Sequence, residues 1–259
     1  MRVTSFEPGP RLGPFVARLS TVESDDEVTR VLMPECGLVL GVRYAGAASL
    51  VAFEGPRRLA DASLTGVQSR VRHMVTHARS GILLVHFRPA GAAAFVRSPL
   101  HELMDTTAPL DALWGRSAVD ELTGRCREAR DTTERLARIE RWLLARLSPA
   151  SASVDPLLAG ALGAIEATRG SLRIAALARE LGVGQDRLEQ RFRRGVGTSP
   201  KHLASLTRMK HALTLRPGRG SWAAVAQASG YFDEAHFSRE FRALTGQPPG
   251  QFFRATAFC

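Results

Sequence analysis

The sequence of 259 residues has few cysteines, only two lysines and no long apolar run. Its three cysteines, Cys36, Cys126 and Cys259, are scattered, which argues against a disulfide framework or a clustered zinc site and favours a reducing compartment. No apolar stretch approaches the ~20 residues that span a bilayer, and the first residues lack the apolar core of a signal peptide. We therefore expect a cytoplasmic protein with no membrane partner.

The charge of the chain is positive and unevenly distributed. Arginine supplies almost all of the formal net charge of +10, because Lys201 and Lys210 are the only lysines. Residues 155–259 contain 15 Lys and Arg against 8 Asp and Glu, whereas residues 1–154 contain 20 against 17. The excess of +7 in the C-terminal part indicates a polyanionic partner, either nucleic acid or an acidic membrane face.

Length and the 44% hydrophobic content allow two domains, each with its own core. Short apolar runs such as VTRVLM, GLVLGVRY and GILLVHFRP are separated by Gly, Pro and charged residues, which predicts an antiparallel β-sandwich or barrel. Beyond them the spacing becomes helical, and SPASASVDP has the composition of a linker. We predict an α+β protein with a β-barrel at residues 10–90 and helices at 90–148 in an N-terminal effector or dimerisation domain (1–148), a linker at 149–156, and an all-α domain at 157–259.

One predicted helix before the linker has an apolar stripe. Helical spacing relates five residues in TTERLARIERWLLARL, namely Leu136, Ile139, Leu143, Leu144 and Leu147. The stripe suits packing within the domain and a dimer seam equally well.

The C-terminal part repeats itself. Five pairs of apolar, glycine or proline residues are 49 positions apart, namely Leu188 and Phe237, Phe192 and Phe241, Gly197 and Gly246, Pro200 and Pro249, and Leu203 and Phe252. Slightly upstream the offset is 48, which pairs Ala178 with Ala226 and Gly182 with Gly230. In each copy the alanine allows two helices to cross closely and the glycine supplies the turn between them. The repeat predicts two helix-turn-helix units.

The outward face of the second helix in each unit is polar. In such a helix the N-terminal residues meet base edges in the major groove, and arginines further along suit phosphates. The alternative is a solvated face of a helical bundle, which the repeat and the local charge disfavour. The predicted DNA-contacting residues are Asp186, Arg187, Glu189, Gln190, Arg193 and Arg194 in the first unit and Glu234, Ala235, His236, Ser238, Arg239 and Arg242 in the second.

Two stretches, ASGYFDEAHFSREFRALTGQPPGQF and GTSPKHLASLTRMKHAL, resemble the C-terminal signature and the linker helix of the AraC/XylS transcriptional regulators. The resemblance implies two units held by a helix at about Pro200–Arg216, with recognition helices in successive major grooves ~34 Å apart. It implies double-stranded promoter DNA as a partner, with RNA polymerase as a further candidate, and it leaves open whether the chain is an activator or a repressor. Gln190 stands where the family most often has arginine, and Gly184 replaces the usual serine. Because Asp186 and Glu189 on the first unit are acidic, we expect affinity to depend more on the second unit.

The N-terminal part resembles a sensor-type domain of one group of these regulators. The matching stretches are HFRPAGAAAFV and ELMDTTAPLDALWG, and they imply a cupin-like β-barrel with trailing helices. Folds of this type host many functions, so the resemblance does not identify a ligand. We expect a small-molecule effector or self-association as a homodimer to control DNA binding.

The alternative class of function is an enzyme fused to the same DNA-binding module. His73, His77 and His86 could share a sheet face, but no carboxylate stands at ligand spacing beside them, so we expect neither a metal nor another cofactor. A repair enzyme with an acceptor cysteine would need a thiolate-stabilising setting around Cys36 or Cys126, which the sequence does not show. We therefore predict a regulator without catalytic residues.

Overall fold

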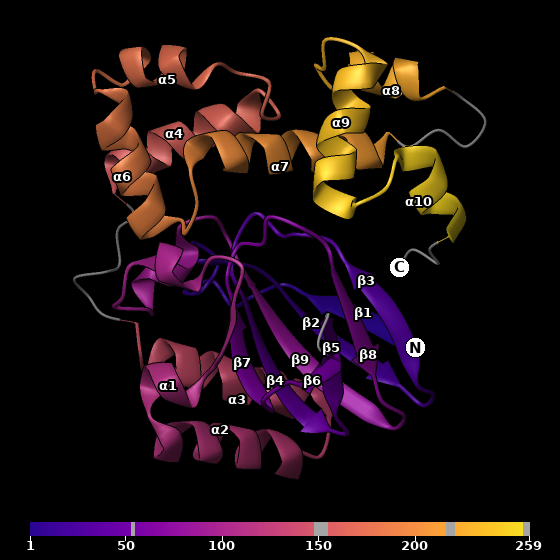
Figure 1. The fold of residues 1–259 in the computed structure, drawn as a ribbon. Helices are drawn as coiled ribbons and strands as arrows, with labels where there is room; N and C mark the ends of the chain where they lie inside the picture. Colours follow the sequence, from indigo (N-terminus) through magenta and orange to yellow (C-terminus); the bar gives the residue numbers. More distant parts are fainter. Residues whose placement is uncertain (53–54, 148–154, 216–220, 256–259) are drawn as a thin grey trace.

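The structure, a computed structural model, describes residues 1–52, 55–147, 155–215 and 221–255. Two antiparallel sheets with helices against them form the N-terminal part, and helices alone form the C-terminal part (Figure 1). The predicted α+β two-domain class is confirmed. Among the described residues no strand pair joins the two sheets, and each sheet ends in edge strands of its own, so the domain is not the closed barrel that we expected.

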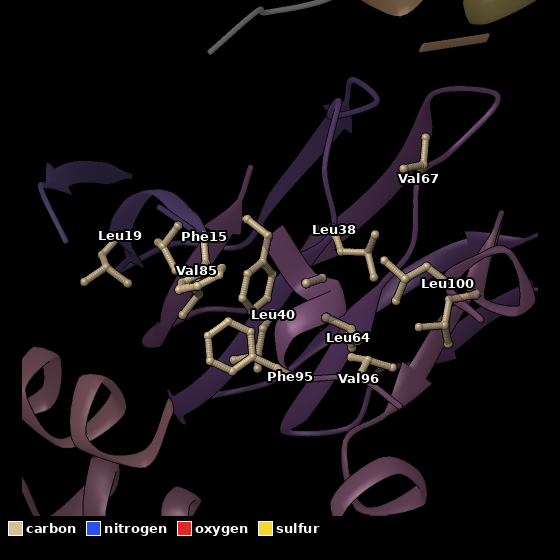
Figure 2. Packing of buried hydrophobic residues seen from close by; sticks show 14 of the residues in the cluster. Phe15, Leu19, Leu38, Leu40, Leu64, Val67, Val85, Phe95, Val96 and Leu100 are labelled. Carbon is tan, nitrogen blue, oxygen red and sulfur yellow. The ribbon is translucent and has the colours of Figure 1, made fainter. Parts of the chain in front are cut away.

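The larger sheet has six strands in the order β1-β2-β9-β4-β7-β10. Their bounds are β1 (Arg2–Phe6), β2 (Val16–Ser24), β9 (Ser80–Phe87), β4 (Val39–Ala45), β7 (Ala62–Thr65) and β10 (Thr107–Pro109). Side chains alternate between its faces. Leu40 pairs with Val85 and Val42 with Leu83 in the register of β4 and β9, and all four are fully buried. This face carries the core of the domain (Figure 2).

The smaller sheet has four strands in the order β3-β8-β5-β6. Their bounds are β3 (Val28–Leu32), β8 (Arg72–Thr76), β5 (Ala48–Ala52) and β6 (Gly55–Arg58). The apolar and alternating runs of the sequence predicted β2, β3, β4, β5, β8 and β9. They did not predict β1, β6, β7 and β10: β6, β7 and β10 have only three or four residues, and β1 is largely exposed.

Short helices and a helical hairpin follow the strands. Their bounds are η1 (Gly91–Ala94), η2 (Leu100–Leu103), α1 (Asp111–Trp114), α2 (Arg116–Glu128) and α3 (Thr132–Leu144). In the apolar stripe of α3, Ile139 and Leu143 are fully buried and belong to the same cluster as Leu40 and Leu83. The stripe therefore packs within the domain, and a dimer seam along it stays a prediction from the sequence.

The C-terminal part contains seven described helices. Their bounds are α4 (Pro156–Ala167), α5 (Ile174–Glu180), α6 (Gln185–Gly195), α7 (Pro200–Thr214), α8 (Trp222–Ala228), α9 (Glu234–Thr245) and α10 (Pro249–Ala255). Of the predicted linker, residues 149–154 lie outside the described residues, while Asp155 caps α4 and Pro156 is its first residue. Arg216, the predicted end of the linker helix, is also outside them. Across the described residues, every helix is too short or too polar to cross a membrane.

Helix α7 contributes side chains to both hydrophobic clusters of the described chain. Leu203 and Ala204 belong to a cluster with α4, α5 and α6, whereas Leu206 and Met209 belong to the cluster that unites the sheet domain with α8, α9 and α10. Figure 1 shows α6 and α9 at opposite ends of α7, with the sheets on the other side of it. Helix α7 therefore joins α4, α5 and α6 on one side to the sheets and α8, α9 and α10 on the other.

Polar contacts reinforce this boundary between the sheets and the helices. Lys210 Nζ on α7 donates to Glu35 Oε2 at 2.5 Å, and the N–H of Val71 donates to the carbonyl of Leu244 on α9 at 2.9 Å. Burial opposes ionisation of Glu35, yet hydrogen bonding with His86 and the charge of Lys210 hold the pKa of its carboxyl below the usual range. The contact with Lys210 is therefore a charged one at neutral pH.

Gly170 tests how tightly α7 is packed. Its φ is 76°, and a Cβ there would overlap the carbonyl oxygen of Ala204. Because the left-handed conformation alone costs an L-residue about 1–2 kcal/mol, we expect Gly170→Ala to lower the free energy of unfolding by more than about 2 kcal/mol. Urea unfolding measures it. Gly124→Ala in the middle of α2, where a Cβ has open space, is the control and should stabilise the protein by about 0.5–1 kcal/mol. Equal urea midpoints for the two variants would contradict the close packing of Gly170 against α7.

Candidate nucleic-acid interface

Helices α5 and α6 form one helix-turn-helix unit, and α8 and α9 form the second. The turn glycines, Gly182 and Gly230, have φ values of 67° and 75°, the left-handed conformation that glycine adopts without strain. The crossing alanines, Ala178 and Ala226, are buried at 3% and 0% exposure. The repeat in the sequence therefore corresponds to two equivalent structural units.

The second helix of each unit is held down by the predicted pair of apolar anchors. Leu188 and Phe192 on α6 are fully buried, as are Phe237 and Phe241 on α9. In the second unit the anchors lie within an aromatic cluster, since Trp222 stacks on Phe237 with ring centroids 5.6 Å apart. The anchors fix which face of each helix points outward.

The outward faces carry the predicted residues. Half-buried are Glu189, His236 and Ser238. Exposed are Asp186, Arg187, Gln190, Arg193, Arg194, Glu234, Ala235, Arg239 and Arg242. None of the twelve is buried, so each helix presents a polar surface of the kind that reads a major groove.

Charges on α6 are partly paired with one another. Arg193 donates to Glu189 Oε1 from both Nε and Nη2, at 3.1 and 2.8 Å. Gln190 and Arg194 line a surface hollow of about 600 Å³ together with Arg97 and Ser98 of the N-terminal domain. The C-terminal half of the predicted first-unit face therefore lies at the boundary between the domains, and its N-terminal half lies away from it.

The two recognition helices begin differently. Asp233 caps α9, since its side chain accepts a hydrogen bond from the N–H of His236 at 2.6 Å. Gly184 occupies the same position before α6 and has no side chain to accept one. An N-cap side chain stabilises a helix by about 0.5–2 kcal/mol relative to alanine, although glycine loses only a few tenths. The start of α6 is the less constrained of the two.

Sequence reasoning missed three features of this surface. Gln185 is exposed at the first position of α6, and the 49-residue offset that pairs it with Glu234 could have identified it. Phe232, in the turn before α9, is 92% exposed and carries no pattern that would single it out. The third feature is a pair of side-chain contacts that attach α6 to the start of α4 and α9 to α7.

Equivalent positions on the two helices, Arg191 and Glu240, face the scaffold and carry opposite charges. Arg191 Nη1 donates to Asp155 Oδ2 at 3.0 Å, which attaches α6 to the start of α4. Glu240 accepts from Arg208 Nη2 at 2.8 and 3.0 Å and from Ser205 Oγ at 3.0 Å, which attaches α9 to α7. The guanidinium of Arg208 also lies 4.4 Å from the ring centroid of Tyr231. These contacts orient the polar faces.

The histidines considered as metal ligands lie in the N-terminal domain, apart from the outward faces of α6 and α9. His77 Nδ1 is 2.9 Å from Glu27 Oε2, and His86 Nε2 is 3.0 Å from Ser20 Oγ, while His73 is exposed on β8. Within the described part of the chain, no group of three or more His, Cys, Asp or Glu side chains could hold a metal ion.

Comparisons with known proteins agree with this geometry. A family model described as a helix-turn-helix domain matches residues 177–255, and one described as a domain of unknown function (DUF6597) matches residues 4–109. A Streptomyces lividans protein described as an AraC-like transcription regulator is 32% identical over 168 residues, which are 59% of this chain and 55% of that protein. Over this stretch the chain is therefore similar to AraC-like transcription regulators.

A second relative with the same description, from Streptomyces antibioticus, is 35% identical over 102 residues. Those residues are 38% of this chain and 33% of that AraC-family protein, so the chain matches about half of the first relative's length and a third of the second's. The structure of ToxT from Vibrio cholerae aligns with 99% of this chain and 100% of its own, with a TM-score of 0.47 and 12% identity.

Replacing Glu240 tests whether its contacts with Arg208 and Ser205 on α7 hold α9 in place. The side chain of Arg208 is only 15% exposed, so replacing its carboxylate partner leaves a guanidinium with a neutral acceptor. We expect Glu240→Gln to lower the free energy of unfolding by about 1–3 kcal/mol, measured by urea unfolding. Glu234→Gln, on the exposed face of the same helix, is the matched control and should cost less than about 1 kcal/mol. The same loss for both variants would show that Glu240 is an ordinary surface charge.

Proposed function

We propose that this chain is a sequence-specific transcription regulator of the AraC type whose helices α6 and α9 read promoter DNA. The observation that carries the proposal is the presentation of two equivalent polar helices at opposite ends of one buried helix, α7. The local charge of the C-terminal part suits the phosphate backbone. A role at promoter DNA accords with the predicted cytoplasmic location.

The length of α7 supports simultaneous insertion of both helices. Fifteen residues, Pro200–Thr214, give an axis of ~22 Å, and the recognition helices that pack at its ends add about one helix diameter of ~10 Å. The separation is then close to the ~34 Å between successive major grooves on one side of DNA. A rigid α7 would let one chain occupy two grooves without bending either unit.

We further infer that the N-terminal domain controls DNA binding through its contacts with the helical domain. It contacts both units, through Leu244 at the end of α9 and through η2 beside α6. Any change in the sheets that breaks the contact between Glu35 and Lys210 would alter the freedom of α7. Self-association and contact with RNA polymerase stay predictions from the sequence.

The enzyme alternative has less support. Burial raises the pKa of the Cys126 thiol to about 11 and also raises the pKa of the Cys36 thiol. Both thiols are therefore protonated near neutral pH, whereas an acceptor cysteine must ionise to attack an alkyl group. The twelve exposed and half-buried residues of α6 and α9 instead suit a binding surface.

Substitutions of Arg239 and Arg242 would distinguish a base contact from a phosphate contact on α9. If Arg239, which is exposed on α9, contacts a base edge as we propose, Arg239→Ala in the full chain should weaken binding to its specific site by about 1–3 kcal/mol and relax the preference at one base position. Arg242→Ala, one turn along, should weaken binding to all sequences alike. Fragments of genomic DNA selected by the wild-type chain supply the site, and affinities for single-base variants measure the preference.

Salt dependence provides the general test of this function. Affinity for the selected site should fall steeply and linearly on a logarithmic scale as salt rises, because binding releases counterions from the phosphates. The Arg242→Ala variant should have a slope smaller by about one. Binding that does not respond to salt, or no binding to any selected fragment, would contradict the DNA-binding proposal.

A further inference from the structure

The turn before the second recognition helix is one residue longer than its counterpart in the first unit. Gly182 and Gly230 are 48 positions apart, whereas the anchors Leu188 and Phe237 are 49 apart. One residue is therefore inserted between the turn glycine and the first anchor of α9. The sequence alone locates it only between positions 230 and 237, but the structure narrows it further.

Phe232 is the inserted residue. Tyr231 and Val183 directly follow the two turn glycines, and both pack against a hydrophobic cluster. Asp233 and Gly184 are equivalent in turn, because they are the N-cap residues of α9 and α6. Only Phe232 stands between these matched positions, and its side chain is 92% exposed. The second unit thus presents an aromatic ring where the first unit has no residue at all.

The backbone is fixed on both sides of this ring. The ring of Tyr231 packs against that of Phe237, with centroids 5.2 Å apart, and the backbone N–H of Tyr231 donates to the carbonyl of Ala226 at 3.0 Å. On the other side Asp233 has an extended backbone with a φ of −154°, and its side chain caps α9. The position of Phe232 is therefore set before any partner binds, which lowers the ordering cost of a contact.

The ring lies at the N-terminal end of α9. The opposite end of this helix contacts the sheets, since the N–H of Val71 donates to the carbonyl of Leu244. Twelve residues give α9 a length of ~18 Å, so the ring and this contact are far apart. In a helix-turn-helix unit, the N-terminal part of the recognition helix meets the base edges of the major groove. Phe232 therefore stands at the end of α9 that the proposed function places in DNA.

The chemistry of the ring and of its neighbours restricts what it can contact there. Single exposed apolar side chains are common, so exposure alone identifies no partner. A phenyl ring offers no hydrogen bond to the polar base edges, and the exposed carboxylates of Asp233 and Glu234 beside it disfavour contact with phosphates. Among the groups that base pairs present in the major groove, the C5 methyl of thymine is the apolar one.

We propose that Phe232 determines specificity in the second unit, and that its ring packs against the methyl group of one thymine beside the bases that α9 reads. The inference rests on the proposed function and deepens it, because it names a base and the side chain that selects it. The first unit has no equivalent residue, so the methyl group is required in one half of the site only. This thymine therefore gives the chain one orientation on the DNA.

Deoxyuridine tests the contact, because it pairs as thymine does and lacks only the methyl group. The full chain is titrated by fluorescence anisotropy with the site selected from genomic DNA and with copies in which each thymine in turn is replaced by deoxyuridine. We expect one replacement to weaken wild-type binding about three- to fivefold, which corresponds to one buried methyl group. It should lie in the half of the site that contains the base position relaxed by Arg239→Ala.

Phe232→Ser removes the ring and keeps a residue that turns accept. This variant should bind the unmodified site about three- to tenfold more weakly than the wild type, and the sensitive deoxyuridine replacement should then have no further effect. Arg242→Ala, which we expect to remove a phosphate contact, should weaken binding to both sites alike and keep the methyl effect. Val51→Ser removes another exposed apolar side chain, on β5, and should bind both sites as the wild type does.

Two measurements separate this role from a structural one. Because the side chain of Phe232 is exposed, Phe232→Ser should unfold at the same urea concentration as the wild type. The deoxyuridine series with the wild-type chain needs no variant, so it tests the contact independently of how Phe232→Ser folds.

Three results would overturn the inference and leave the proposed function in place. They are equal wild-type affinity for every deoxyuridine copy, an undiminished methyl effect in Phe232→Ser, and unchanged affinity of Phe232→Ser for the selected site, which would assign the ring to a partner other than DNA. A wild-type chain that binds none of the selected fragments would instead contradict the proposed function, and this inference with it.

Discussion

Helix α7 must pack against three partners at once, and this constraint sets the arrangement of the whole molecule. Its first turns lie in the cluster of the first unit, through Leu203 and Ala204, and its later turns lie in the cluster of the second unit and the sheets, through Leu206 and Met209. A helix buried on several sides cannot rotate or shift without opening a core. The distance between α6 and α9 therefore follows from the length of α7.

The two units are equivalent in fold but unequal in attachment. The second unit shares a single apolar cluster with the sheet domain and has a capped recognition helix. The first forms a separate cluster, to which the described part of the N-terminal domain contributes the buried Ala90 and the partly buried Cys36. Fewer buried contacts allow more local freedom. A signal from the sheets would therefore move the second unit together with the N-terminal domain and leave the first to adjust.

The periodicity of the sequence predicted the features that the two units share. It did not predict contacts that a side chain makes in only one of the units. The 49-residue offset placed Phe237 and Phe241 correctly, and the 48-residue offset placed the turn glycines, because those positions depend on local packing that both copies share. The roles of Arg191 and Glu240 could not be predicted, since their partners come from α4 and α7 and carry opposite charges. The closed barrel was likewise an expectation from strand spacing, which does not determine how edges pair.

The N-terminal domain buries a charged residue on one face of the sheet whose other face holds the core. The core lies on the helix-covered face of the larger sheet, whereas Arg43 is 3% exposed on the face between the sheets, and its Nε and Nη1 atoms have no hydrogen-bond partner among the described residues. Burying such a group costs on the order of several kcal/mol, and hydrophobic burial on the other face offsets this cost. Glu35, on the same side of the larger sheet, binds Lys210 on α7, so the charged groups between the sheets lie beside a contact that joins the two parts of the chain.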